Sequence, residues 1–596
     1  MKVKKIIINK YKEKIILLVF LISLYISTIW INFYYLATKN VDFFLYYDYI
    51  NYFIGAGGED FSSGYGSFYF FLISMIFKSN FDFVTQINFP TILSYSVQNV
   101  NFIFYLSGLL GIYKLFKLYK IDTFLILLSL TVLNFFPQSI YMRAVMKPEI
   151  VGFAVLPWIL YYLDLYKKEN KSIYLFFSLP FLIIILTSKP SIAGMTLLYL
   201  LIFYGNLIKL IKPKLLIIIL LVVLIALLIG YAESFLITSN YFFERSYNDN
   251  YDNIAPISII FKVSIKEVFT NPFFDYEINL NKYNIHANSI INITLLDTFG
   301  DYFNQLFDSV DNDFSKNRKD LFTTEGEDFI NDNRVIKYSG PYGLLLETNL
   351  NLVRKNLSVI LTILFYLVLF YFIIKDHKYR NIYSMPFIGI LILYINSLGI
   401  PSPNFNPSLG DTFKVFYYSF LISIAFTLVT AKVLDKLKFF KMLFVILWIC
   451  IIFFVAGHPK KIDQGFSENL IFSNQYSSFC EVNNFLFFEN ELIQKIHSSG
   501  NTKKLKSNCD KQISLIEKSD ENNYYGKQRQ QCVINNVINV NLRNKSYCAY
   551  PIVTYLRFND NNSKSPTYPY FSIFTFMLAI AFPIFQFKIM KKLRSH

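Results

Sequence analysis

The sequence has little charge and none of the short motifs that mark several classes of soluble enzyme. Only 16% of the 596 residues are charged and 54% are hydrophobic, whereas a soluble protein carries about 25% charged residues. The chain contains no P-loop, G-x-S-x-G, H-E-x-x-H or Gly-rich dinucleotide fingerprint. These absences argue against an ATP-driven pump and a zinc protease.

Cysteine is scarce and unevenly placed. Of the five cysteines, Cys450 falls in an apolar run and the others fall in a polar stretch near the C-terminus. No C-x-x-C pair is present, and neither His458 nor His497 stands at ligand spacing, so disulfides are favoured over a metal site. An even number of cysteines in an exported domain predicts two disulfides among Cys480, Cys509, Cys532 and Cys548, with the pairing left open.

The hydrophobic residues fall in blocks of about 17–22 residues, long enough to cross the hydrocarbon core as helices. This pattern predicts an α-helical polytopic membrane protein with about 12 transmembrane helices. The predicted spans are Ile15–Leu36, Leu93–Tyr113, Phe124–Tyr141, Ile150–Leu165, Ile173–Leu186, Ile192–Ile208, Leu215–Tyr231, Leu357–Ile374, Ile382–Leu398, Val415–Val429, Met442–Ala456 and Tyr570–Phe587. The shorter apolar segment Gly66–Phe77 suits an interfacial or re-entrant helix.

The basic residues predict which side of the membrane each loop faces. Lysine-rich segments such as MKVKKIIINKYKEK, YKKENK, KDHKYR and KIMKKLRSH alternate with acidic or long loops. Because cytoplasmic loops are rich in Lys and Arg, both termini are expected to be cytoplasmic and the first apolar run to be a retained anchor. The net charge of +16 then reflects topology, and no nucleic acid is needed to explain it.

Long polar insertions divide the chain into five regions. Residues 1–232 form an N-terminal membrane module whose first outward loop is 37–92, and 233–356 form an outward-facing insertion. Residues 357–456 form a second membrane module, 457–567 an outward-facing disulfide-bonded domain, and 568–596 the final transmembrane helix and a cytoplasmic tail. We expect the outward domains to be mixed α/β, because structureless loops of such length are uncommon.

Ionisable residues gather at the outer ends of the predicted spans. The segments YMRAVMKPEI, TSKPS and NPSLGDTFKV supply the residues predicted to bind the donor phosphate, which are Arg143, Lys147, Glu149, Lys189 and Lys414. The basic side chains suit a phosphate group, and positive charge is normally depleted on the outer face. The alternative for any single lysine is that it snorkels at a helix end. The carboxylates of the first loop, including Asp42 and Asp48, suit a general base that takes a proton from an acceptor hydroxyl.

The first loop resembles that of the GT-C superfamily of membrane glycosyltransferases, which use polyprenyl-phosphate sugars. In VDFFLYYDYINYFIGAGG an acidic residue follows the first span, and GYGSFYFFL stands where the family has a tyrosine-rich P-P-L-Y-Y segment, here without the proline pair. MKPEI resembles the family's second-loop R-P-E segment, with Lys147 in place of Arg and Glu149 at the acidic position. The resemblance covers 15–165 and implies a GT-C-like fold with Asp42 as catalytic base, or Asp48 as the fallback.

The middle outward stretch contains a second candidate group. HANSIINITLLDTFGDYFNQ mixes aromatic and polar residues that suit sugar rings, so His286, Asp297 and Asp301 are candidates for binding the acceptor or sugar. The alternative is a packed helix with an acidic end. Although no metal ligand is assigned, the triplet Asp311–Asp313 leaves a divalent metal open as a cofactor.

Together these features predict an enzyme of the cell envelope, in a bacterial inner membrane. It would lie in the lipid bilayer and move a sugar from a lipid-linked polyprenyl-phosphate donor to a glycan, lipid or protein acceptor on the outer face. A polysaccharide or lipid transporter is the first alternative, disfavoured by the lack of an internal repeat. A non-enzymatic envelope scaffold is the second, and it would make no use of the acidic first loop.

Overall fold

The computed structural model of the chain describes residues 2–35, 37, 46, 49–50, 53, 65–66, 68–79, 89–209, 211, 213–231, 268–269, 289–300, 349–397, 414–437 and 440–456. The described segments form α1 (Lys2–Tyr34), α3 (Phe68–Ser79), α4 (Phe89–Leu118), α5 (Thr123–Leu133), α6 (Pro137–Ala144), α7 (Glu149–Glu169), α8 (Ile173–Leu186), α9 (Pro190–Ile208), α10 (Pro213–Gly230), α14 (Ile290–Asp297), α17 (Asn349–Lys375), η3 (His377–Tyr379), α18 (Arg380–Tyr383), α19 (Met385–Ser397), η4 (Val415–Tyr418), α21 (Ser419–Lys436) and α22 (Lys441–Ala456).

Long apolar helices make this an α-helical membrane protein. Within the described ranges, six helices are long and apolar enough to cross a bilayer, in α1, α4, α7, α9, α17 and the η4–α21 segment. The pair α5 and α6 adds a seventh if it counts as one span, although it is bent by 65°. The helices α3, α8, α10 and α22 are apolar but shorter.

The prediction of about twelve spans is therefore wrong for the described part of the chain, and the reason is helix length. Several predicted spans are helices, but short ones: α8 has 14 residues, which rise about 21 Å, less than the roughly 30 Å hydrocarbon core. The predicted span Ile382–Leu398 is divided between α18 and α19. Tyr570–Phe587 lies outside the described residues.

The described ranges contain helices and no strand, so the predicted mixed α/β character of the outward domains finds no support there. Most of the insertion 233–356 and all of the domain 457–567 lie outside the described residues. The segment predicted as a short interfacial or re-entrant helix is α3, with 12 residues.

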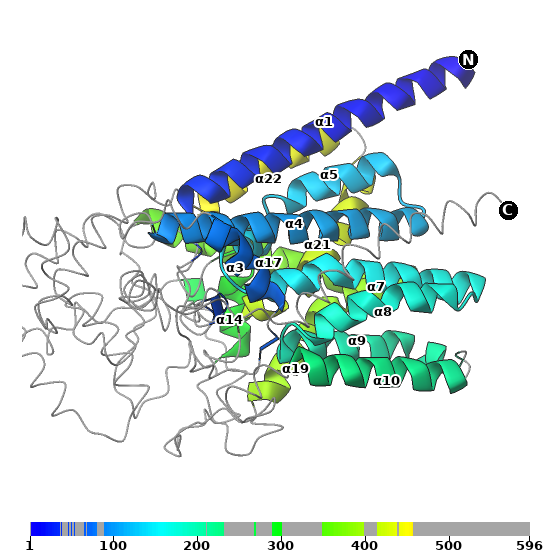
Figure 1. Cartoon of the computed structure of the whole chain (residues 1–596). Helices are drawn as coiled ribbons and strands as arrows, with labels where there is room; N and C mark the ends of the chain where they lie inside the picture. Colours follow the sequence, from blue (N-terminus) through cyan, green and yellow to red (C-terminus); the bar gives the residue numbers. More distant parts are fainter. Residues whose placement is uncertain are drawn as a thin grey trace, which may run out of the picture.

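The helices α7 and α21 form the centre of the bundle. Of the apolar window in each, 78% of α7 and 83% of α21 is buried, against 39% of α1 and 33% of α17. The helix α7 packs along α4 and α8, while α21 packs against α5, α7 and α19. Figure 1 shows α4, α7, α8, α9 and α10 running side by side, with α1 crossing over one face. The outer helices therefore leave apolar side chains such as Leu18, Leu221 and Leu367 for lipid.

A glycine lets α7, α9 and α21 meet closely one turn after α7 begins. A Cβ at Gly152 would lie 2.9 Å from Cγ of Phe420 on α21 and 3.1 Å from Cγ2 of Ile192 on α9. Small residues allow helix backbones to approach in this way. The close approach brings the N-terminal ends of α7, α9 and η4 together.

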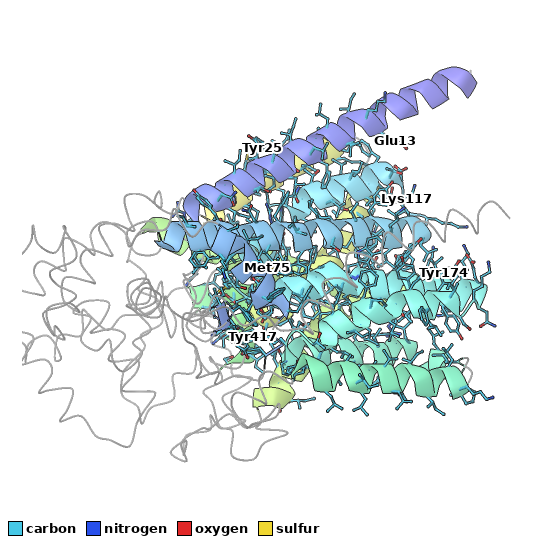
Figure 2. All side chains as sticks on the ribbon, viewed as in Figure 1. Glu13, Tyr25, Met75, Lys117, Tyr174 and Tyr417 are labelled. Atoms are coloured by element: carbon cyan, nitrogen blue, oxygen red, sulfur yellow. The ribbon has the colours of Figure 1, made fainter. Side chains whose placement is uncertain are left out.

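The lysine-rich turns lie at one end of the bundle. Figure 2 shows Lys117 and Tyr174 at one end and Tyr417, in η4, toward the other. The helix α7 begins at Glu149, and its last turn carries Lys167 and Lys168. The lysine-rich turns and the converging helix N-termini thus lie at opposite ends.

Candidate functional site

Three buried lysines surround one tyrosine ring where α7, α9 and η4 begin. The Nζ atoms of Lys147, Lys189 and Lys414 lie 5.0, 4.4 and 5.5 Å from the centroid of the Tyr417 ring. All three lysines are at most 5% exposed. The face of an aromatic ring attracts cations, so Tyr417 stabilises the positive charge of these buried ammonium groups. We call these three lysines and Tyr417 the lysine cluster.

Local sequence explains why the lysines stand at helix starts. Lys147 and Lys189 each precede a proline, and the residue before proline is pushed into an extended conformation. Lys189 is extended (φ −152°, ψ 133°), and Pro190 begins α9; Pro148 stands just before α7. Lys414 is also extended and precedes η4. The amide groups at the starts of α7 and α9 add partial positive charge to that of the lysines.

A buried ion pair joins α7 to the start of α9. The Nζ atom of Lys189 lies 2.5 Å from Oε1 of Glu149, and the two side chains are 6% and 0% exposed. Glu149 opens α7, where a negative charge also interacts favourably with the helix N-terminus. A buried pair of this kind must keep both partners, because removing one leaves an uncompensated charge.

Two points of the first outward loop are fixed next to the lysine cluster. At its start, the amide of Met146 donates to the carbonyl of Ala37 at 3.2 Å. Near its middle, the amide of Gly66 donates to the carbonyl of Ser188 at 3.0 Å. In each bond the partner of the loop is the residue immediately before a cluster lysine, so the first half of the loop is anchored at the cluster.

Aromatic side chains of this loop continue to the cluster. The Tyr65 ring centroid lies 5.4 Å from Nζ of Lys189. The hydroxyl of Tyr49 donates to the carbonyl of Tyr65 at 3.2 Å and accepts from its amide at 3.1 Å. Phe70 stacks on Tyr49 with centroids 4.7 Å apart. The segment GYGSFYFFL therefore supplies a wall of the site.

Polar groups of α4 and α3 hold the linker that leads to Lys147, a feature that the sequence analysis missed. Nδ2 of Asn101 donates to the carbonyls of Arg143 (3.2 Å) and Val145 (2.9 Å). Its Oδ1 accepts from the hydroxyl of Tyr69 at 2.8 Å, and burial raises the pKa of that hydroxyl well above its ordinary value. The available signal was a polar Asn inside a predicted span, which is costly unless it is bonded.

Arg143 does not contribute its guanidinium to the lysine cluster. Its Nη1 donates to Ser27 Oγ at 3.0 Å, and its Nη2 donates to Thr28 Oγ1 at 2.8 Å, both on α1. The guanidinium also lies 4.6 Å from the Tyr105 ring centroid. These contacts tie α6 to α1 and give no support to the phosphate-binding role predicted for Arg143.

Asp297 acts on the backbone next to the cluster. Its Oδ2 accepts from the amide of Val415 at 3.1 Å, one residue after Lys414. Its carbonyl accepts from Nε2 of Gln138 at 2.6 Å. The carboxylate thus fixes the start of η4, whereas the prediction had it binding sugar.

The remaining predicted site residues lie outside the described residues. These are the candidate bases Asp42 and Asp48, the candidate sugar-binding residues His286 and Asp301, and the cysteines Cys480, Cys509, Cys532 and Cys548. Cys450, predicted in a span, is an exposed free thiol on α22. Among the described residues, no group of His, Cys, Asp and Glu is placed to hold a metal ion.

The site therefore combines positive charge, helix N-termini and aromatic walls at one end of a membrane bundle, and these features suit an anionic ligand. Lys147, Glu149, Lys189 and Lys414, predicted from three separate loops, lie together. Comparison of the chain with protein-family models, with curated proteins and with solved structures finds no match.

Proposed function

We propose that the protein is a membrane glycosyltransferase that moves a sugar from a polyprenyl-phosphate donor to an acceptor hydroxyl. The observation that carries the proposal is the gathering of Lys147, Lys189 and Lys414 around the Tyr417 ring. Ammonium groups of lysine bind phosphate as point charges, and their attraction is strong where water is excluded. In the transfer, the bond from the anomeric carbon to the phosphate oxygen breaks, and the lysines stabilise the negative charge left on that phosphate.

The anchored first loop supports the role of base for Asp42 or Asp48. Asp42 follows Ala37 by five residues, which span at most about 18 Å when extended, and Ala37 is bonded to the residue before Lys147. A carboxylate in that loop would take the proton from the acceptor hydroxyl as its oxygen attacks the anomeric carbon. The proposal includes a GT-C-like fold, with further spans outside the described residues.

The position of the lysine-rich turns supports a location for the reaction. Lysine-rich turns favour the cytoplasmic side, and the lysine cluster lies at the opposite end. The reaction would then take place on the outer face of a bacterial inner membrane, with both termini cytoplasmic. Its product would be an envelope glycan, a glycolipid or a glycosylated protein.

Binding of farnesyl phosphate to the purified protein in lipid nanodiscs tests the proposal. Lys414→Gln removes one charge from the cluster and should weaken binding about 10- to 100-fold, the loss of one charge-assisted contact. Lys436→Gln is the matched control, because Lys436 also lies over an aromatic ring, 4.8 Å from Tyr371, but at the lysine-rich end. We expect the control to bind like the wild type.

Sugar transfer is then measured with labelled farnesyl-phosphoryl glucose, mannose and galactose on membrane extracts that contain the acceptor. Failure of the wild-type protein to bind farnesyl phosphate would reject the proposal. An equal loss of binding in Lys414→Gln and Lys436→Gln would also reject it, because binding would then not depend on the cluster. Transport of the lipid without transfer would favour the transporter.

A further inference from the structure

One carboxylate oxygen in the site is buried and lacks a hydrogen-bond partner. Oε1 of Glu149 pairs with Lys189. Oε2 is buried and accepts no hydrogen bond from any of the described residues. The Glu149 side chain is 0% exposed. An unsatisfied buried carboxylate oxygen is destabilising, so its retention calls for a functional explanation.

Three hydroxyls of the site already donate elsewhere. The hydroxyl of Tyr69 donates to Asn101. The hydroxyls of Thr187 and Ser188, just before Lys189, donate to the carbonyls of Ile183 and Ile185 at 2.8 Å each. These three hydroxyls are therefore not available to Oε2, which could instead accept a hydrogen bond from a ligand.

A phosphate cannot be that ligand group, because a second anion beside a carboxylate repels it. Glu149 is therefore better suited to a neutral hydrogen-bond donor than to the phosphate of the sugar donor, which was its predicted ligand. A sugar hydroxyl meets this requirement, since it donates one hydrogen bond and carries no charge.

We infer that Oε2 of Glu149 accepts a hydrogen bond from a hydroxyl of the sugar whose phosphate lies against the lysines. The inference rests on the proposed function and makes Glu149 a residue that selects the glycosylated lipid over the bare lipid phosphate. Lys189 connects the sugar-binding carboxylate to the phosphate-binding lysines, because it pairs with Glu149 and belongs to the lysine cluster. After transfer, the lipid phosphate keeps its lysine contacts but loses the contact with Glu149, which favours its release.

The test compares two probes, farnesyl phosphate and farnesyl-phosphoryl hexose (glucose, mannose and galactose esters in turn), on the full chain in nanodiscs. Glu149→Gln keeps the size of the side chain and its acceptor for Lys189 but removes the negative charge. We expect about 10-fold weaker binding of the hexose ester, since a hydrogen bond to a neutral group is about half as strong as one to an ion. Farnesyl phosphate should bind unchanged or more tightly, because a repelling charge is gone.

The double variant Glu149→Gln with Lys189→Met guards against misfolding, since it replaces the ion pair with a neutral pair. The measured quantity is the ratio of the two affinities, which should change in Glu149→Gln and in the double variant. Equal weakening of both probes in Glu149→Gln would overturn the inference, because Glu149 would then act only by positioning Lys189. No change for either probe would overturn it as well. If the wild type binds farnesyl phosphate but none of the hexose esters, only this inference is refuted. If the wild type binds neither probe, the proposed function is refuted as well.

Discussion

Replacing Gly66 by alanine should displace the turn that carries Lys189. A Cβ at this position would overlap the carbonyl oxygen of Thr187 and lie 2.5 Å from its carbonyl carbon. Ordinary contact begins at 3.4 Å, so the carbonyl carbon alone requires the two backbones to separate by about 0.9 Å, and the closer carbonyl oxygen requires more. Backbone atoms cannot rotate out of the way as a side chain can.

The displacement has two calculable consequences. The bond from the Gly66 amide to the Ser188 carbonyl, 3.0 Å in the structure, is lost or weakened, which costs about 1–3 kcal/mol if the buried groups stay unpaired. Lys189 follows Ser188 directly, so its ammonium moves by a similar amount relative to the other lysines. A misplacement of about 1 Å can lower a rate about 100-fold.

The assay for Gly66→Ala combines the thermal unfolding midpoint with farnesyl phosphate affinity in nanodiscs. We expect a lower midpoint and affinity reduced by about 10-fold, as for the loss of one charged contact. Gly194→Ala is the matched control, because it lies on α9, the helix that Lys189 precedes, and an added Cβ there meets nothing within 4 Å. Wild-type affinity and stability in Gly66→Ala would refute the reasoning, since the first loop would then not hold the Lys189 turn.

Two further substitutions separate support from binding. Arg143→Leu should lower the free energy of unfolding by about 1–3 kcal/mol through lost bonds to Ser27 and Thr28, and leave farnesyl phosphate affinity intact. Weaker binding at unchanged stability would show instead that Arg143 contacts the ligand. Asn101→Leu should lower stability and weaken binding together, because the linker before Lys147 loses two donors, whereas Tyr69→Phe removes only one bond and should have a smaller effect on both. An affinity unchanged in Asn101→Leu would contradict a positioning role.

The positions of the membrane helices could be predicted from hydropathy because burial in lipid demands unbroken apolar runs. The helix α8 has the bounds predicted for it, Ile173–Leu186, and α7, α9 and α17 overlap their predicted spans closely. Run length alone could not show where such a run bends. The predicted span Phe124–Tyr141 is two helices at 65°, and Pro137 at the start of α6 marks the break, since proline cannot continue the hydrogen-bond ladder of a preceding helix.

The candidate site was predictable only to the level of which loops share a face. Alternating lysine-rich loops were enough to put Lys147, Lys189 and Lys414 at one end. The direction of a side chain depends on tertiary contacts that a local pattern does not contain. Arg143 was grouped with the lysines because it stands four residues before Lys147, yet α6 directs its guanidinium to α1. The partners of Asn101 were likewise invisible, because its bonds reach residues more than forty positions away.

The use of an aromatic ring at the centre of the lysine cluster has a physical consequence for ligand binding. A carboxylate that pairs with a lysine cancels its charge, as Glu149 does for Lys189. The face of Tyr417 attracts all three ammonium groups through its quadrupole, and the ring itself carries no charge. Burying lysines is costly, and a neutral ring lowers this cost without adding negative charge to the site. The ring is therefore compatible with an anion that binds the same lysines, as the proposed function requires.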